Sequence, residues 1–174
     1  MTPSYLWTRT LRPLYDKAVE LYRGGNRELE TYFTEEEMAF LASIGLHQIN
    51  LYDYAEDLVG YGEPDWNTVL LIVAARRDYF LYHQHGVTAN SVTEAAELPP
   101  KTEELEGIPW LPRIIAKANC FLKGGLCHEI MYGCGGDRRF LKEHNIHPAD
   151  FLRAIWASGG DRGKVLAFVK GSGK

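Results

Sequence analysis

Apolar residues recur every three to four positions along most of this chain, in runs that end at glycine, proline or asparagine. This spacing places apolar side chains on one face of an α-helix. No run alternates apolar and polar residues over the length of a β-strand. The pattern therefore predicts a mostly α, compact fold of about seven or eight helices, with little or no strand.

Polar residues at the starts of the apolar runs predict where helices begin. Thr34 and Glu37 have the spacing of a capping box, in which each side chain bonds a backbone N–H group near the other residue. Asp65 precedes the longest run, which reaches Gly86, and Asp137 precedes another. We therefore predict helix starts at these positions, with Asp137 as an N-cap.

The length of 174 residues suits one domain. We predict an N-terminal helical half over residues 10–86, a long loop rich in Thr, Glu and Pro over 87–109, and a C-terminal helical half over 110–171. No internal repeat is evident. Residues 1–100 carry 7 Lys+Arg and 15 Asp+Glu, and residues 101–174 carry 12 and 8. The two halves either attract each other on docking, or the second presents a basic binding patch.

The overall charge excludes some classes of function. A net charge of -4 argues against wrapping of nucleic acid. The longest apolar run, residues 69–75, is far shorter than the roughly 20 residues that span a bilayer. An odd number of cysteines (Cys120, Cys127 and Cys134), without a secretory signal, indicates reduced thiols. We therefore expect a cytoplasmic protein without nucleic acid or membrane partners, and a homo-oligomer remains open.

The segment "GCGGDRR", residues 133–139, is the most unusual in the chain. Gly133, Gly135 and Gly136 allow backbone N–H groups to surround an anion. Arg138 and Arg139 would stand in the first turn of a helix, where the helix dipole disfavours cations. A bound phosphate or carboxylate, held by a guanidinium fork and beside Asp137, would explain them. Alternatively, the arginines pair with acidic residues of the first half and the glycines only form a tight turn.

Cys134 lies inside this segment. A thiol near helix-terminal N–H groups and guanidinium groups is favoured as a thiolate, so Cys134 is a candidate nucleophile, with His128 as base and Tyr132 as helper. Most free cysteines are, however, inert packing residues. Cys127, His128 and Cys134 also raise the possibility of zinc, although they lack a paired C-x-x-C spacing, and we assign no metal ligands.

Charged residues on apolar helix faces extend the candidate site. Arg113 and Lys117 are four residues apart and repel each other unless an anion lies beside them or the face is solvated. Arg76 and Arg77 interrupt the apolar run of the longest predicted helix. A buried charge must be paired, so these arginines either join a structural network or clamp a substrate. The expected acidic partners of the network are Asp53, Glu56 and Asp57.

The chain contains the segments "IPWLPRIIAKA", "MYGCGGDRRFL" and "FLRAIW", preceded by "FLASIG", "YGEPDW" and "LLIVAARRDYF". Together they resemble the bacterial family called domain of unknown function 5069. The resemblance extends from about residue 33 over most of the chain. It departs after Ala118, where Asn119, Cys120, Phe121 and Gly125 replace a more basic run. The resemblance implies a small, soluble bacterial domain without an established activity, and it names no cofactor.

These observations lead to one hypothesis and two alternatives. We expect a small anionic ligand in a cleft between the halves, bound by the turn with Arg113 and Lys117, and with Asp78 and Tyr79 on the opposite wall. If the protein is an enzyme, Cys134 or Asp78 would act on that ligand. The first alternative is a non-catalytic module that binds a partner through residues 87–109. The second is a metal enzyme that uses His, Cys and Asp side chains.

Overall fold

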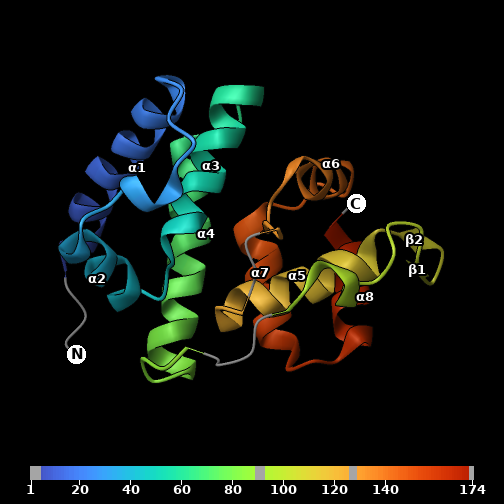
Figure 1. The fold of residues 1–174 in the computed structure, drawn as a ribbon. Helices are drawn as coiled ribbons and strands as arrows, with labels where there is room; N and C mark the ends of the chain where they lie inside the picture. The colour runs from blue at the N-terminus through green and yellow to red at the C-terminus, as the bar shows by residue number, and fades with distance from the viewer. Residues whose placement is uncertain (1–4, 89–92, 126–128, 173–174) are drawn as a thin grey trace. The chain divides into compact units, whose positions relative to one another are not determined.

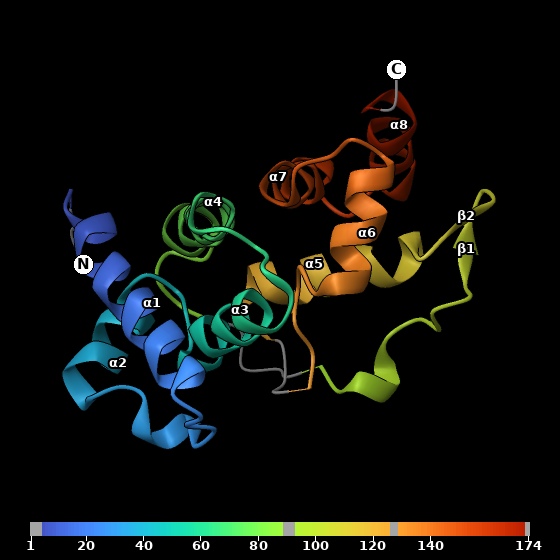
Figure 2. The same ribbon diagram turned by 90° about the horizontal axis from the view of Figure 1, so that it is seen from above.

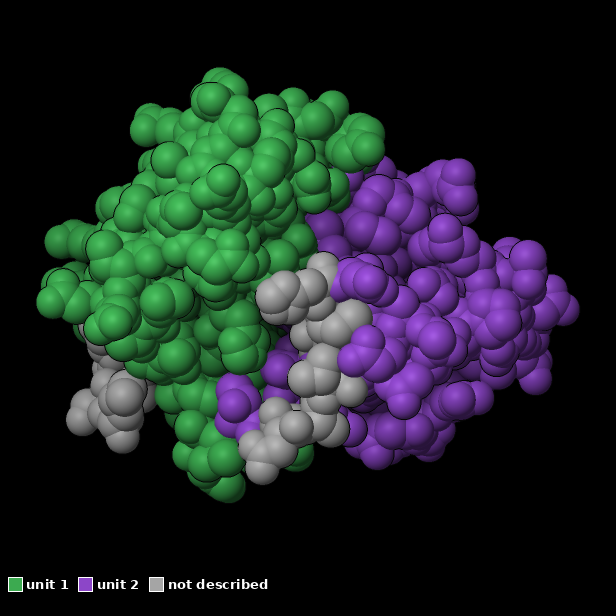
Figure 3. Space-filling view, in the orientation of Figure 1, with its two compact units in different colours: residues 1–87 green, residues 88–174 purple. Residues whose placement is uncertain are grey.

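The structure is a computed structural model that describes residues 5–88, 93–125 and 129–172 (Figures 1 and 2). These residues form eight α-helices and one pair of two-residue strands, so the predicted mostly α fold is confirmed. The chain divides into two compact units, Met1–Val87 (unit 1) and Thr88–Lys174 (unit 2) (Figure 3). The boundary lies at the start of the predicted loop.

Unit 1 is built from four helices, and the predicted caps begin two of them. Thr34 Oγ1 accepts the Glu37 N–H at 3.2 Å, and the Glu37 carboxylate accepts the Thr34 N–H at 2.8 Å, so the capping box is confirmed. Asp65 accepts the Thr68 N–H at 2.9 Å. α1 packs along α3 (Figure 1). The helices are α1 (Trp7–Arg23), α2 (Glu35–Ser43), α3 (Gln48–Tyr61) and α4 (Trp66–Asp78), with a π-helical turn (Tyr79–His83) after α4.

Unit 2 begins with short elements in place of a featureless loop. A 3-10 turn (Ala95–Glu97) is followed by the antiparallel strands β1 (Glu104–Leu105) and β2 (Ile108–Pro109). Glu106 and Gly107 join the strands with φ of 53° and 77°. Four helices follow, and in them α7 packs against both α5 and α8. They are α5 (Leu111–Lys123), α6 (Gly135–Glu143), α7 (Pro148–Ser158) and α8 (Arg162–Ser172).

The two units repeat one four-helix arrangement. α1 and α5 end 100 positions apart, α2 and α6 coincide at both ends with that offset, and α3 and α7 begin with it. The fourth helices begin at Trp66 and Arg162, an offset of 96. The offset falls because α3 has 14 residues and α7 has 11, and because the connection after α3 is one residue longer.

Equivalent positions also have equivalent conformations and burial. The turn between the second and third helices has a left-handed residue in both units, Gly45 (φ 77°) and Asn145 (φ 53°). His47 and His147 are the N-caps that follow. Buried residues coincide at Leu11 and Leu111, Ala18 and Ala118, Tyr32 and Tyr132, Leu41 and Leu141, Leu51 and Phe151, Val69 and Val165, and Val73 and Val169.

The positions of the helices therefore repeat, although no internal repeat is evident in the sequence. Most equivalent positions hold different residues, and what they share is burial, a cap or a backbone conformation. Packing selects apolar side chains by volume and shape, so Leu51 and Phe151 are equivalent in the core although they differ in sequence. The repeat supplies the candidate site residues of unit 2, such as Cys134 and Asp137, with counterparts in unit 1.

Candidate functional site

The first turn of α6 differs from the prediction. Its N-cap is Cys134, and Gly135 and Gly136 are its first two residues, so the prediction of Asp137 as N-cap is wrong. Gly133 is the glycine of this segment that needs a left-handed conformation, with φ 85°. Asp137 instead turns its side chain into the interior, where it is fully buried.

Asp137 is the centre of a buried polar cluster. Its carboxylate accepts the Trp110 indole N–H at 2.9 Å and the Gly133 backbone N–H at 3.0 Å. The Lys117 ammonium, 4% exposed, forms a salt bridge with the same carboxylate. Three donors surround one buried carboxylate, which is how a buried charge becomes tolerable. The N–H of Gly133, expected to bind an external anion, thus binds an anion of the protein itself.

Unit 1 contains the same ion pair at the equivalent positions. Lys17 Nζ lies 2.7 Å from Glu37 Oε2, and these two residues correspond to Lys117 and Asp137. Burial of Glu37 opposes its ionisation, but the Lys17 and Thr34 hydrogen bonds outweigh that effect and hold the pKa of Glu37 below its ordinary value. Because both units have the pair, we assign the ion pair itself a role in the stability of the fold.

The other predicted cations of unit 2 have separate roles. Arg138 is 4% exposed and donates to the Gly133 carbonyl at 2.7 Å, so it closes the turn from inside. Arg113 donates to the Pro99 carbonyl at 2.7 Å. Arg139 is exposed beside the first turn of α6. The predicted pair of guanidinium groups is thus divided, with Arg139 facing solvent and Arg138 in the interior.

Cys134 differs in chemistry from its counterpart in unit 1. Its counterpart Thr34 caps α2 with its hydroxyl, whereas the Cys134 side chain makes no capping hydrogen bond to α6. Its sulfur instead accepts a hydrogen bond from Lys117 Nζ at 3.2 Å. Cys134 is partly exposed, so the sulfur is placed between a buried ammonium and solvent.

The first turns of α2 and α6 also carry different charges. Glu35, Glu36, Met38 and Ala39 of unit 1 correspond to Gly135, Gly136, Arg138 and Arg139 of unit 2. Compared with α2, α6 therefore lacks two carboxylates and carries two additional guanidinium groups. The acidic first turn of α2 complements the helix dipole. In the first turn of α6, Gly135 is exposed, whereas the Trp110 ring approaches Gly136 closely.

The remaining predicted catalytic residues are Tyr132, Asp78 and His128. Tyr132 is 1% exposed and its hydroxyl donates to the Pro148 carbonyl at 2.7 Å, so it is buried like Tyr32 in unit 1, although Tyr32 donates to the Asn26 carbonyl. Asp78 is partly exposed in unit 1. Cys127 and His128 lie outside the described residues. Within the described ranges, no three His, Cys, Asp or Glu side chains are close enough together to hold a metal ion.

Trp110 is the site residue that the sequence did not reveal. It stands at φ 69° directly before α5, and its indole N–H bonds Asp137. A Cβ atom at Gly136 would lie 2.5 Å from Trp110 Cζ2, so this glycine is required by the close approach of the ring. No local pattern around Trp110 signals either contact, because both partners lie more than 25 residues further along the chain.

Arg76 and Arg77 in unit 1 do not pair with the acidic residues expected for them. Arg76, 1% exposed, donates to Gln84 Oε1 at 2.8 Å and lies 5.3 Å from the Phe80 ring centroid. No carboxylate forms an ion pair with it among the described residues, and burial lowers the pKa of Arg76 to about 10. Arg77 lies 3.6 Å from Asp78 and 5.0 Å from the Trp7 ring centroid.

Arg76→Met is expected to leave the protein as stable as the parent or to stabilise it by about 1–3 kcal/mol, because it removes a buried charge that no carboxylate neutralises. Arg77→Met is the matched control and should cost about 1 kcal/mol, since it loses its ion pair and its stacking on Trp7. Urea denaturation of both variants measures the difference. A destabilisation by Arg76→Met larger than that by Arg77→Met would contradict this assignment.

Arg76, Arg77 and Tyr79 of the predicted ligand-binding set lie in unit 1, and the turn with Arg113 and Lys117 lies in unit 2. Tyr79 is buried, with its ring 4.5 Å from that of His83, and burial raises the pKa of its hydroxyl. The predicted cleft between the halves stays a prediction. The site that the structure assembles is the one within unit 2.

No protein-family model matches the chain, and no curated protein and no solved structure is found to be similar to it. In the described part of the chain, every helix is too short or too polar to cross a membrane.

Proposed function

We propose that unit 2 binds a small anionic group, a phosphate or carboxylate, at the first turn of α6, and that the Cys134 thiol reacts with the bound molecule. The observation that carries this proposal is the 3.2 Å contact between Lys117 Nζ and Cys134 Sγ at the N-cap of α6. An adjacent ammonium and a helix N-terminus both favour the thiolate form of a cysteine. The thiolate is the nucleophilic form.

The comparison of the two units supports this assignment. Thr34, Glu37 and Lys17 cap and brace α2 without a thiol, so bracing of the helix needs no sulfur. The counterparts of the two glutamates Glu35 and Glu36 are glycines, which removes negative charge from the place an anion would occupy. Arg139, four residues after Gly135 on α6, is exposed and would supply a guanidinium group.

The proposal divides the roles of the residues. The N–H groups of the first turn of α6 and Arg139 would bind the anion, and Cys134 would supply the sulfur nucleophile. Lys117 would position and polarise the sulfur while Asp137 fixes Lys117. Arg138 would hold the carbonyl of Gly133 and thereby the shape of the turn.

Alkylation by iodoacetamide tests both parts of the proposal. Cys134 should be labelled about tenfold faster than Cys120, because Cys120 Sγ lies 2.9 Å from the Thr93 hydroxyl and, among the described residues, forms no hydrogen bond with an ammonium group. Both cysteines are partly exposed, so Cys120 is an internal control for access. The site of labelling is read by mass spectrometry of peptides.

Phosphate or sulfate should slow the labelling of Cys134 and leave that of Cys120 unchanged. Arg139→Ala should remove this protection, whereas Arg153→Ala, an exposed arginine on α7, should not. Equal labelling of the two cysteines would contradict the reactive thiol. Protection that persists in the Arg139→Ala protein, or that affects Cys120 equally, would contradict the anion site.

A further inference from the structure

The contact between Lys117 and Cys134 brings together two groups that can form a covalent bond. Lys117 Nζ lies 3.2 Å from Cys134 Sγ. Lys117 is 4% exposed, whereas Cys134 is partly exposed. Atoms held about 3–3.5 Å apart are within reach of bond formation when they are suitably oriented. A buried amine nitrogen is therefore held at an attacking distance from a sulfur atom that solutes can reach.

The surroundings of Cys134 favour oxidation of its sulfur. The Lys117 ammonium and the N-terminal end of α6 both favour the thiolate, and the thiolate is the form that hydrogen peroxide oxidises. The sulfur attacks one oxygen of the peroxide, the O–O bond breaks, and hydroxide leaves. The product is a sulfenic acid, whose hydroxyl group can be displaced by a thiol or by a nitrogen.

The structure supplies a nitrogen for this displacement. Among the described residues, the hydrogen-bond partner of Cys134 Sγ is the Lys117 amine. Cys120 Sγ contacts the Thr93 hydroxyl at 2.9 Å, and Cys120 and Cys134 are both free cysteines. Once Cys134 is oxidised, the group already in contact with its sulfur is therefore Lys117.

Asp137 allows a buried lysine to act as a nucleophile. An ammonium group has no lone pair, so it must lose a proton before it can attack sulfur. The Asp137 carboxylate forms a salt bridge with Lys117 and can accept that proton. The nitrogen of an S–N bond is neutral, and so is protonated Asp137. The reaction thus leaves both partners of the former salt bridge uncharged, which avoids the large cost of an unpaired ion in the interior.

Unit 1 has the ion pair without the thiol. Lys17 pairs with Glu37, but the residue at the position of Cys134 is Thr34, whose hydroxyl caps α2. A hydroxyl group does not undergo the stepwise oxidation of a thiol. The oxidisable group is therefore a feature that unit 2 has in addition to the shared ion pair.

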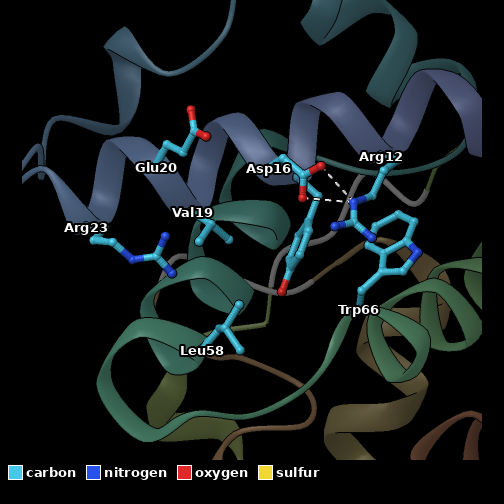
Figure 4. Close-up of a pocket in the computed structure, with 8 residues that line it drawn as sticks. Arg12, Asp16, Val19, Glu20, Arg23, Leu58 and Trp66 are labelled. Atoms are coloured by element: carbon cyan, nitrogen blue, oxygen red, sulfur yellow. Dashed lines mark hydrogen bonds and ion pairs between the residues drawn. The ribbon is translucent and has the colours of Figure 1, made fainter.

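The surface groove along α1 of unit 1 offers no second pair of this kind (Figure 4). Its lining residues include neither lysine nor cysteine. Arg12 Nε donates to the two carboxylate oxygens of Asp16 at 2.8 and 2.7 Å, and its guanidinium lies 4.9 Å from the Trp66 ring centroid. A guanidinium group remains protonated in proteins, so Arg12 cannot act as a nitrogen nucleophile as Lys117 can.

We propose that hydrogen peroxide joins Cys134 to Lys117 by a covalent S–N bond, a sulfenamide, and that small thiols reverse it. The Lys117 amine displaces hydroxide from the sulfenic acid, and the second proton of the nitrogen leaves with that hydroxide as water. Two molecules of a small thiol then break the S–N bond, restore the thiol and the amine, and become a disulfide. This modification rests on the proposed function, because it requires the reactive thiol, and it switches that thiol off reversibly.

Peptide mapping after treatment with excess hydrogen peroxide tests the bond. The parent and the Cys120→Ser, Cys127→Ser variant, in which Cys134 is the remaining cysteine, are both cleaved after glutamate, which separates residues 117 and 134 at Glu129. The peptides of Lys117 and Cys134 should be joined, with two hydrogen atoms fewer than their sum, and dithiothreitol should separate them. The proposal would be overturned by a disulfide of Cys134 in place of this link, by a link to another nitrogen, or by a link that retains an oxygen atom.

Lys117→Arg keeps a cation beside Asp137 but removes the nucleophilic amine. Dimedone, which traps sulfenic acids, should label Cys134 in this variant at least about fivefold more than in the parent, because the acid is no longer consumed. Lys142→Arg, an exposed lysine of α6, is the matched control and should behave as the parent. Equal trapping in Lys117→Arg and the parent would overturn the link.

The outcomes also separate this modification from the proposed function. Trapping of Cys134 as a sulfenic acid in the parent, without a link to Lys117, would overturn the link and leave the reactive thiol supported. If Cys134 were neither oxidised nor alkylated by iodoacetamide faster than Cys120, the reactive thiol would fail together with the link.

Discussion

Asp137→Ala is expected to destabilise unit 2 by about 3–5 kcal/mol, because it leaves the Lys117 ammonium buried without a carboxylate. The indole N–H of Trp110 and the backbone N–H of Gly133 lose their acceptor in the same variant. Urea denaturation followed by tryptophan fluorescence measures the loss, since Trp110 reports directly on the cluster.

The equivalent substitution in unit 1 is the control for this prediction. Glu37→Ala removes a capping box and a part-exposed ion pair, whose side chains are 38% and 26% exposed, and should cost about 1 kcal/mol. The pKa of Glu37 is held low, so its contribution is present above the ordinary pKa of a glutamate and is lost as the pH falls through the lowered value. A loss for Asp137→Ala no larger than that for Glu37→Ala would contradict the buried cluster.

The double variant Lys117→Met with Asp137→Leu separates the charge from the packing. It removes both ions and fills the space with apolar groups, so it should recover at least half of the stability lost in Asp137→Ala. In the same protein, the labelling of Cys134 by iodoacetamide should fall to the rate of Cys120, because the ammonium beside its sulfur is gone. If the double variant recovered stability but its Cys134 were labelled as fast as in the parent, Lys117 would contribute to stability and not to the reactivity of Cys134.

Gly136→Ala is expected to destabilise unit 2 by about 1–3 kcal/mol. The added Cβ would lie 2.5 Å from Trp110 Cζ2 and 2.8 Å from Cη2, inside van der Waals contact. Trp110 cannot withdraw freely, because its indole N–H is bonded to Asp137. Thermal and urea unfolding report the cost, and near-ultraviolet circular dichroism reports the displacement of the ring.

The neighbouring glycine is a matched control. A Cβ at Gly135 would meet its nearest atom, Arg138 Nη2, at 3.8 Å, an ordinary contact. Because Gly135 is already helical, Gly135→Ala should be neutral or stabilise the helix by up to about 1 kcal/mol. If the two variants were equally stable, the close approach of Trp110 to α6 would be ruled out.

The helix starts at Thr34 and Asp65 followed from the sequence because a cap acts within one turn of its own helix. The start of α6 did not follow. Asp137 has the residue type of an N-cap, but Lys117 and Trp110 draw its carboxylate into the interior, and the cap falls to Cys134. The preference of an aspartate for the N-cap position was therefore outweighed by its contact with Lys117, which lies 20 residues earlier in the chain.

The sequence singled out the segment of the candidate site but did not predict the arrangement of its side chains. The glycines and arginines marked residues 133–139 as unusual, but Arg138 and Arg139 have the same residue type and opposite burial. Helical periodicity separates the two faces of a helix only when the helix start and the neighbouring elements are known. The wrong start at Asp137 therefore removed the information that distinguishes the two arginines.

The sequence by itself determined the helical class, the approximate positions of the helices and the capping box, since these depend on interactions between residues a few positions apart. Only the tertiary structure revealed the repeat of two units and the partners of Lys117 and Arg76. Each of these depends on which side chains packing brings together across distant parts of the chain. Packing conserves burial, so residues as different as Leu51 and Phe151 can stand at one position of the same fold.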